Sequence, residues 1–476
     1  MGFVRHVLTV GAGGLITQVL TVATMPVLSR LYSPVSFAGW AVFMSVALIF
    51  ASVATLRYEL AIVLPKDHAD GINVLAVSFL ATVGISLIAV CLLPLIGPGL
   101  LGDRLSTELQ GWLWWLPLQI LTGGFFTSLT YWLIRTKEFA YYTIFQTALP
   151  LFTIMIQLWA AILDIKSSSG LIMGSIGGQV IVTVLLVVVV KKKLPPVLLH
   201  SVSWSKIQNL SFTYRMYPFY MTPYTLMGAM RDRVVYFILG AFGSKGDAGF
   251  YNLSSRLVNM PNSFLSSAIR PVFFQKAAAK DLINLETSII KIMQMLLIVT
   301  IPFWVLFLFH APSLFALIFG EPWREAGLYA AILSVPAIPL ILGNWLDRAF
   351  DVLGRQRLAF FLEALFAVAS IAALFAGMWF FESTMAAVSL QALVLGLYYC
   401  VWLAVLFKAA SFRFSGLRDL FFLALILGGI SALANWLCMI IFPGLLSFWL
   451  MAVILIGFVG TYLVRMRRHN GEILNT

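Results

Sequence analysis

The chain has 476 residues, of which 61% are hydrophobic and only 11% charged, and its formal net charge is +12. Soluble domains are about 45–50% apolar and about 25% charged, so this composition excludes a soluble globular protein and indicates an integral membrane protein. The positive charge is not gathered in a basic domain outside the apolar segments. Nucleic acid is therefore not expected as a partner.

The apolar segments predict an all-α protein. A membrane-spanning helix needs about 20 mainly apolar residues. On that rule we expect about fourteen spans, near residues 8–29, 37–63, 72–97, 112–134, 141–163, 170–190, 214–242, 248–273, 289–310, 326–352, 358–381, 384–407, 419–441 and 443–464. Cys91, Cys400 and Cys438 all fall in these segments, which predicts reduced, buried thiols and no disulfide.

The basic residues predict the orientation. With the N-terminus in the cytoplasm, the cytoplasmic loops and ends hold 19 of the 31 Lys and Arg, the outer loops hold five, and seven lie inside spans. Lys and Arg accumulate in cytoplasmic loops, so both termini are expected in the cytoplasm.

The eighth span, 248–273, is the least apolar. At about 100° per residue its polar side chains fall within an arc of about 100°, and they are Asn252, Arg256, Asn259, Ser263, Ser266, Ser267 and Arg270. A helix of this kind crosses a membrane only if its polar side is hidden from lipid. Either this side lines a water-filled cavity or it packs against another helix; two Arg on it favour the cavity.

An internal repeat divides the chain. "WLIRTKEFAYY" (132–142) matches "DVLGRQRLAFF" (351–361) through Leu133/Leu353 and Arg135/Arg355, and "AGW" at 38–40 matches "AGF" at 248–250. Both matches place spans 1–6 against spans 7–12, which predicts two six-helix lobes related by a pseudo-twofold axis. The expected parts are an N-lobe (1–190), a cytoplasmic linker (191–213), a C-lobe (214–410), and a C-terminal helix pair with a basic tail (411–476).

Two stretches resemble a known family. "PVLSRLYSPVSFAGWAVF" with "LRYELAIVLP", and "DRVVYFILGAFGSKGDAGFYNLSSRLVNMPNSFLSSAIRPVF", are similar to bacterial polysaccharide and O-antigen flippases. These belong to the multidrug, oligosaccharidyl-lipid and polysaccharide (MOP) exporter superfamily. The resemblance covers roughly residues 1–410. Fourteen spans exceed the commoner twelve and match the span count of the lipid II flippase of the same superfamily.

The resemblance implies a flippase that moves an undecaprenyl-diphosphate-linked oligosaccharide from the cytoplasmic to the outer leaflet of the bacterial inner membrane. O-antigen, capsule or exopolysaccharide synthesis would consume it. No cofactor is implied; H⁺ and Na⁺ are the candidate coupling ions. The partners implied are the lipid-linked oligosaccharide, membrane lipids, and the polymerase and glycosyltransferases of the pathway. Two alternatives stay open: a cation-coupled multidrug antiporter of the same superfamily, and a membrane polysaccharide polymerase or ligase.

With Lys291, at the edge of the span 289–310, counted as cytoplasmic, all seven cations embedded in the spans are Arg, although the chain contains 12 Lys. Arg stays charged when desolvated, and its planar fork fits paired phosphate oxygens. The candidate substrate-binding residues are therefore Arg57, Arg215, Arg231, Arg233, Arg256, Asn259 and Arg270. The alternative is that nearby acids neutralise them as buried pairs. The candidate gating or ion-pair residues are Glu59, Asp232, Asp347, Arg348, Asp351, Arg135 and Arg355.

Arg231 and Arg233 lie about 200° apart on an ideal helix, so they cannot face one cavity together. We expect Arg233 to face it, with Asp232 pairing with one of the two. The sequence contains no His/Cys cluster with metal-ligand spacing and no Ser/His/Asp set. A catalytic function is therefore not expected, and the protein is predicted not to be an enzyme.

Overall fold

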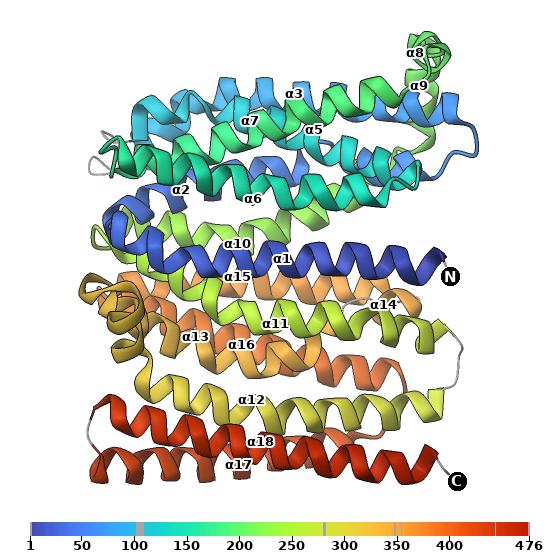
Figure 1. Ribbon diagram of the computed structural model, residues 1–476. Helices are drawn as coiled ribbons and strands as arrows, with labels where there is room; N and C mark the ends of the chain where they lie inside the picture. Colours follow the sequence, from blue (N-terminus) through green and yellow to red (C-terminus); the bar gives the residue numbers. More distant parts are fainter. Residues whose placement is uncertain are drawn as a thin grey trace. The chain divides into compact units, whose positions relative to one another are not determined.

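The computed structural model describes residues 2–100, 109–278, 282–346, 349–353, 355–442 and 444–474, and no strand occurs among them. Fourteen of its helices have 20 residues or more (Figure 1): α1 (Gly2–Leu31), α2 (Pro34–Val53), α3 (His68–Leu100), α5 (Leu116–Arg135), α6 (Phe139–Ile162), α7 (Ser168–Lys193), α10 (Thr222–Phe242), α11 (Asp247–Ala278), α12 (Leu282–Phe319), α13 (Arg324–Gly343), α15 (Gln356–Phe381), α16 (Thr384–Ala409), α17 (Phe414–Ile441) and α18 (Leu445–Leu474). The expectation of an all-α membrane protein with about fourteen spans is confirmed.

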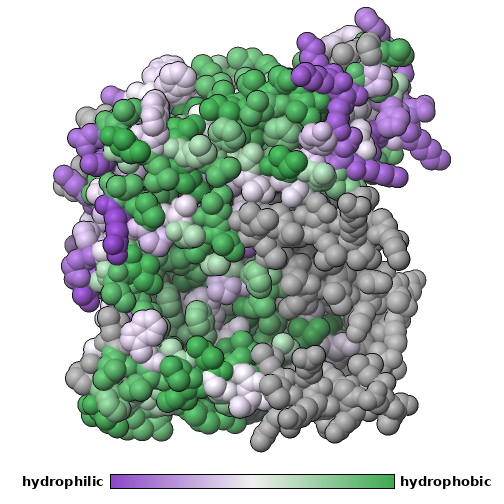
Figure 2. Space-filling model, viewed as in Figure 1, coloured by the Kyte–Doolittle hydropathy of each residue, from purple (hydrophilic) through white to green (hydrophobic). Residues whose placement is uncertain are grey.

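The surface of these helices is apolar. Within the described ranges, nine helices are long and apolar enough to cross a membrane. Only 6% of the apolar stretch of α17 is buried inside the protein. Figure 2 shows the same property as a broad hydrophobic surface, with hydrophilic side chains gathered around α8 (Pro196–His200) and α9 (Trp204–Thr213). Surface of this kind is stable only when lipid covers it, so the chain is a multi-pass membrane protein.

Lipid also explains one wrong expectation. The three cysteines are free thiols, but Cys91 and Cys400 are exposed rather than buried. An apolar residue of a membrane helix need not face the protein interior, because the hydrocarbon around it is equally apolar.

The chain forms two compact units. Unit 1 comprises Met1–Asn252 and Glu363–Ala387, and unit 2 comprises Leu253–Leu362 and Val388–Thr476. In unit 1, α6 packs closely on α7. The evidence is at Gly174, where an added Cβ would lie only 2.3 Å from the Gln157 Cγ atom. Small residues let membrane helices approach closely in this way. In unit 2, α12 packs against α13, α17 and α18 (Figure 1).

The second span is interrupted. α2 ends at Val53, a turn follows, and the 3-10 helix η1 (Tyr58–Val63) completes the segment that the sequence predicts as one span. Leu56 and Arg57 have φ angles of 48° and 61°. The left-handed region costs a non-glycine residue about 1–3 kcal/mol and cannot continue a right-handed helix.

The seventh and tenth spans are also irregular. The seventh opens with a π-helical turn, η2 (Tyr217–Met221), before α10 begins. Pro218 lies in this turn and Pro223 follows it, and proline removes the N–H that a regular helix would use. The tenth span continues from α13 through η4 (Asn344–Leu346) and α14 (Ala349–Val352).

The repeated turns are similar in hydrogen bonding but shifted in register. After α5, the Glu138 N–H donates to the Leu133 carbonyl over 2.8 Å; after α14, the Arg355 N–H donates to the Phe350 carbonyl over 2.9 Å. Both bonds span five residues, as in a Schellman helix end. In the alignment given by these hydrogen bonds, Arg355 corresponds to Glu138. The sequence match instead pairs Leu133 with Leu353, so the two alignments differ by three residues.

Candidate functional site

The break in the second span holds a buried ion pair. Glu59 is only 1% exposed, and its Oε1 atom lies 3.1 Å from Arg57 Nη1. The Thr55 hydroxyl donates to the other carboxylate oxygen of Glu59. A buried carboxylate is stable only with such partners. The left-handed turn thus folds Arg57 back onto the acid two residues later, and Arg57 Nε is buried without a hydrogen-bond partner among the described residues.

Two contacts hold η1 in place. The Tyr58 hydroxyl donates to the Ser211 carbonyl of α9 over 3.0 Å. Arg135, at the end of α5, donates from Nη1 to the Ile62 carbonyl over 2.8 Å and from Nη2 to the Asp67 carbonyl over 2.7 Å. Its guanidinium group also lies directly over Gly71, where a Cβ would come within 2.4 Å of Nε. Arg135 is therefore bound to the backbone of the loop after η1.

The charged segment of α10 forms a second cluster. Arg231 donates from Nε to Asp232 over 2.9 Å and from Nη1 to Glu363 of α15. The Arg231 and Glu363 side chains are 13% and 10% exposed, whereas that of Asp232 is 58% exposed. Gly228 lies one turn before Arg231, and a Cβ there would be 3.8 Å from Glu363 Oε1. Two carboxylates thus share one guanidinium, one of them from a helix far away in sequence.

Arg233 has different surroundings. It is half-buried, and the structure shows no hydrogen bond or ion pair for it within the described part of the chain. It interacts electrostatically with the buried Tyr251, which packs edge-on against Tyr236 at a centroid distance of 5.3 Å. Of the two arginines of this segment, Arg231 is neutralised and Arg233 keeps its charge available.

The polar stripe of α11 is mixed in exposure. Asn252 and Ser266 are buried, Arg256 is half-buried, and Asn259 and Ser263 are exposed. Ser266 accepts a hydrogen bond from Asn344 over 3.2 Å, so part of the stripe packs against another helix of unit 2. Arg270 lies in α11, but its side chain is outside the described residues. Packing against another helix is therefore observed for Ser266, and the water-filled cavity stays a prediction for the exposed residues.

The remaining predicted residues are dispersed. Arg215 is exposed in the turn before η2, with its guanidinium carbon 3.9 Å from the centroid of the Phe212 ring. Arg355 is exposed. Asp347 and Arg348 lie outside the described residues, as does the side chain of Asp351 in α14.

Glu363 is the functional candidate that the sequence left unassigned. The sequence predicts only that nearby acids pair with embedded Arg, and Glu363 is one of those acids. The signal was present, since Glu363 is the only acidic residue of α15. A lone acid in an apolar span needs a partner, and the nearest choice is an Arg-rich helix.

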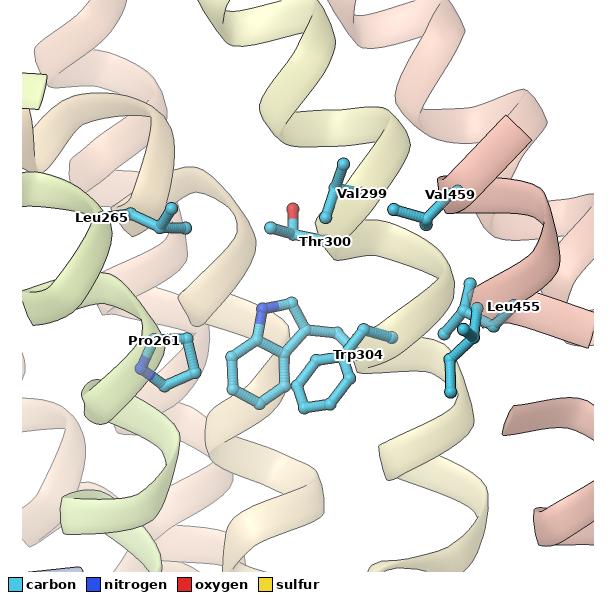
Figure 3. A pocket seen from close by; sticks show the side chains of 10 residues that line it. Pro261, Leu265, Val299, Thr300, Trp304, Leu455 and Val459 are labelled. Carbon is cyan, nitrogen blue, oxygen red and sulfur yellow. The ribbon is translucent and has the colours of Figure 1, made fainter. Parts of the chain in front are cut away.

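Unit 2 contains an apolar cavity of about 560 Å³ between α11, α12 and α18 (Figure 3). Pro261, Leu265, Thr300, Trp304 and Leu455 line it. The Thr300 hydroxyl is bound to the Leu296 carbonyl over 2.6 Å, so it offers little polarity. Trp304 is only 2% exposed, and its Nε1 atom has no partner among the described residues. The cavity therefore suits a hydrocarbon chain far better than a sugar.

No group of three or more metal-ligating side chains occurs among the described residues. The fold is shared with membrane exporters. The structure of the lipid II flippase MurJ in an inward closed conformation matches with a TM-score of 0.73 at 12% identity, covering 96% of this chain and 98% of that one. An inward-facing multidrug resistance MATE transporter of the MOP superfamily matches with a TM-score of 0.63 at 13% identity, covering 83% and 94%. A MOP superfamily transporter from Pyrococcus furiosus matches with a TM-score of 0.53 at 12% identity, covering 87% and 96%. The chain has the fold of a MOP-type exporter.

The family follows from the sequence. The model of a family described as polysaccharide biosynthesis protein matches residues 27–327, more than half of the chain. The chain therefore belongs to this polysaccharide biosynthesis family. No curated protein matches it in sequence.

Proposed function

We propose that this protein is a flippase for an undecaprenyl-diphosphate-linked oligosaccharide. It moves the substrate from the cytoplasmic to the outer leaflet of the bacterial inner membrane, with both termini in the cytoplasm. O-antigen, capsule or exopolysaccharide synthesis consumes the product. Transport proceeds by alternating access through the cationic inter-lobe cavity that the sequence predicts. The protein performs no covalent chemistry and needs no cofactor; H⁺ and Na⁺ remain the candidate coupling ions.

The observation that carries this proposal is Arg233. A cation inside a membrane span costs several kcal/mol, so it persists where it has a function or a counter-ion. Arg233 has no ion pair among the described residues, and it lies on the helix that also carries Arg231. A guanidinium group binds phosphate oxygens in pairs, which suits a diphosphate that must leave water. Membership of a polysaccharide biosynthesis family makes a lipid-linked saccharide the substrate that fits this charge.

The cavity between α11, α12 and α18 supports a place for the lipid. α18 contributes Leu455, Ile456 and Val459 to this cavity, so we infer that the last two spans provide a groove for the prenyl tail. A hydrocarbon chain gains about 25 cal/mol per Å² when its apolar surface moves from water into the protein. It gains far less when that surface moves there from lipid. The cavity would therefore orient the tail rather than supply the affinity.

A transport assay tests the proposal. Vesicles containing the purified full-length protein and a radiolabelled undecaprenyl-diphosphate oligosaccharide are treated with a membrane-impermeant glycosidase. We expect the cleaved fraction to rise above the half that is initially accessible, and Arg233→Ala to abolish the rise. Vesicles that never exceed the protein-free control for any lipid-linked saccharide would refute the flippase.

The multidrug antiporter is the second candidate, because its solved representative shares the fold. It requires an acid free to bind H⁺ or Na⁺ and to attract a cationic drug. Both buried acids described above, Glu59 and Glu363, are instead bound to Arg. Accumulation of a cationic dye in the same vesicles, driven by an imposed H⁺ or Na⁺ gradient, would favour the antiporter.

A further inference from the structure

The contact between Arg231 and Glu363 joins two helices of unit 1 at a buried position. α10 brings the guanidinium and α15 brings the carboxylate, and both side chains are about nine-tenths buried. The other groups facing this contact from α10 are Asp232, which accepts a hydrogen bond from Arg231 Nε, and Gly228, which leaves room beside Glu363 Oε1. We propose that Glu363 is a resident counter-anion, which occupies Arg231 while no substrate is bound and which the diphosphate of the substrate displaces. This inference rests on the proposed function, because it names the step by which the same cationic site takes its ligand.

The first argument is energetic. A guanidinium group without a partner at this depth would be unstable, so an empty site needs a substitute for its ligand. A carboxylate is the closest protein group to a phosphate, since it offers two oxygens to the same fork. Glu363 meets the guanidinium through its Oε1 atom on Nη1, and it carries less charge than a diphosphate.

The second argument is the asymmetry between the two arginines. Arg233 is two residues from Arg231 and has no ion pair in the described part of the chain. It attracts an anion at long range from the opposite side of α10 and does not contact the same phosphate as Arg231. Arg231 becomes available only when an incoming anion outcompetes Glu363, because its Nη1 atom is otherwise bound. The pair thus separates a permanent cation from one that is released on binding.

The third argument is that the contact is replaceable. Asp232 remains on Arg231 after Glu363 leaves, so Arg231 keeps one carboxylate. The space at Gly228 is open apart from Glu363 Oε1 at 3.8 Å, which lets the carboxylate swing aside without a steric clash. A purely structural ion pair would have no need of either feature.

Affinity measurements test the proposal. Purified full-length protein in nanodiscs is titrated with farnesyl diphosphate by calorimetry. Glu363→Gln removes the competing charge but preserves the size of the side chain, so we expect the Kd to fall about tenfold. In Arg231→Gln/Glu363→Gln this gain should disappear, because the released guanidinium is then absent. Glu325→Gln, which removes an exposed acid of α13 outside this contact, should leave the Kd within about twofold.

Transport kinetics distinguish a Glu363 that competes with the substrate from one that only packs the two helices. Glu363→Gln should show a lower KM and a lower kcat, since the substrate leaves slowly when no carboxylate reclaims Arg231. Glu363→Asp keeps the charge and should restore most of the wild-type kcat. Unchanged or weaker binding by folded Glu363→Gln, or a gain that survives in the double variant, would overturn the resident counter-anion. Absence of diphosphate binding to the wild type would overturn it as well. The proposed function is judged independently, by translocation of the full lipid-linked saccharide in the wild type.

Discussion

Arg57 and Arg231 each lie against a carboxylate that is almost wholly buried, whereas Arg233 lies beside tyrosine rings. The same residue type therefore has two kinds of surroundings in one chain. The charge of a paired Arg is offset by its carboxylate partner, whereas an Arg without an ion pair attracts anions.

Glu59→Gln should destabilise the protein. The amide still accepts from Thr55, but the guanidinium of Arg57 loses its counter-charge in a buried place. Arg57 is 29% exposed, so water compensates in part. We expect a loss of about 1–3 kcal/mol, seen as a thermal midpoint lower by several degrees in detergent. Glu325→Gln changes an exposed acid and serves as the control; equal midpoints for both variants would contradict the structural assignment of Glu59.

Arg256→Ala and Arg270→Ala should abolish polysaccharide export at matched protein levels in the membrane. Both residues lie on the polar stripe of α11, which carries no acid after Asp247. Lys should restore export only in part, because it provides a point charge rather than a fork. Arg324→Ala is the control, since that Arg is 51% exposed and bound to Glu321. Normal export by both α11 variants would show that the cationic-cavity model is wrong.

At this scale the sequence identifies which residues are unusual but not which of them meet. Every embedded Arg is visible in the sequence, because a charge in an apolar run stands out. The contact of Arg231 with Glu363 is not, since 132 residues separate the two and only the packing of α10 on α15 joins them.

At the scale of elements, the break after α2 is the feature that hydropathy misses. The segment 37–63 is apolar apart from Arg57 and Glu59, so it predicts one span. Its interruption falls on Leu56 and Arg57, which are neither Gly nor Pro and give no local signal. The spans themselves were predictable because apolar length alone sets them; the π turn at Tyr217–Met221 was predictable only as a disturbance by two prolines.

Arg135→Ala should loosen the loop after η1. It removes two hydrogen bonds to the carbonyls of Ile62 and Asp67, each contributing about 1 kcal/mol. We expect amide exchange over residues 62–67 to become about 10- to 30-fold faster, as a local opening of that energy predicts. Arg355→Ala, at an exposed turn residue, should have no such effect.

Transport supplies a second measurement of the same element. Arg135 binds backbone and not sugar, so Arg135→Glu/Arg355→Glu should change the rate by a similar factor for every saccharide that the protein accepts. Selective loss of one saccharide would instead place these residues in the binding site.

At the scale of the whole molecule, the apolar cavity of unit 2 should receive the prenyl tail. A photoreactive group on the tail of a polyprenyl-diphosphate saccharide should label the segments that contain Thr300 and Leu455. Val459→Trp fills the cavity and should reduce this labelling, whereas Leu433→Trp, at a side chain 57% exposed on α17, should not. Labelling that never reaches residues 455–460 would leave α17 and α18 as a stabilising brace.

The charges around Arg231 have one more consequence, which concerns voltage. Arg231 and Arg233 carry two positive charges, and Asp232 and Glu363 carry two negative ones, so the cluster is electrically neutral when empty. Moving a charge through the full membrane field changes the energy by about 2.3 kcal/mol per 100 mV. These four side chains therefore add no charge to the return of the empty protein, but a bound diphosphate adds negative charge that a negative interior repels outward. Transport should consequently depend on voltage: hyperpolarisation speeds the outward step, and this cluster adds no opposing cost to the return.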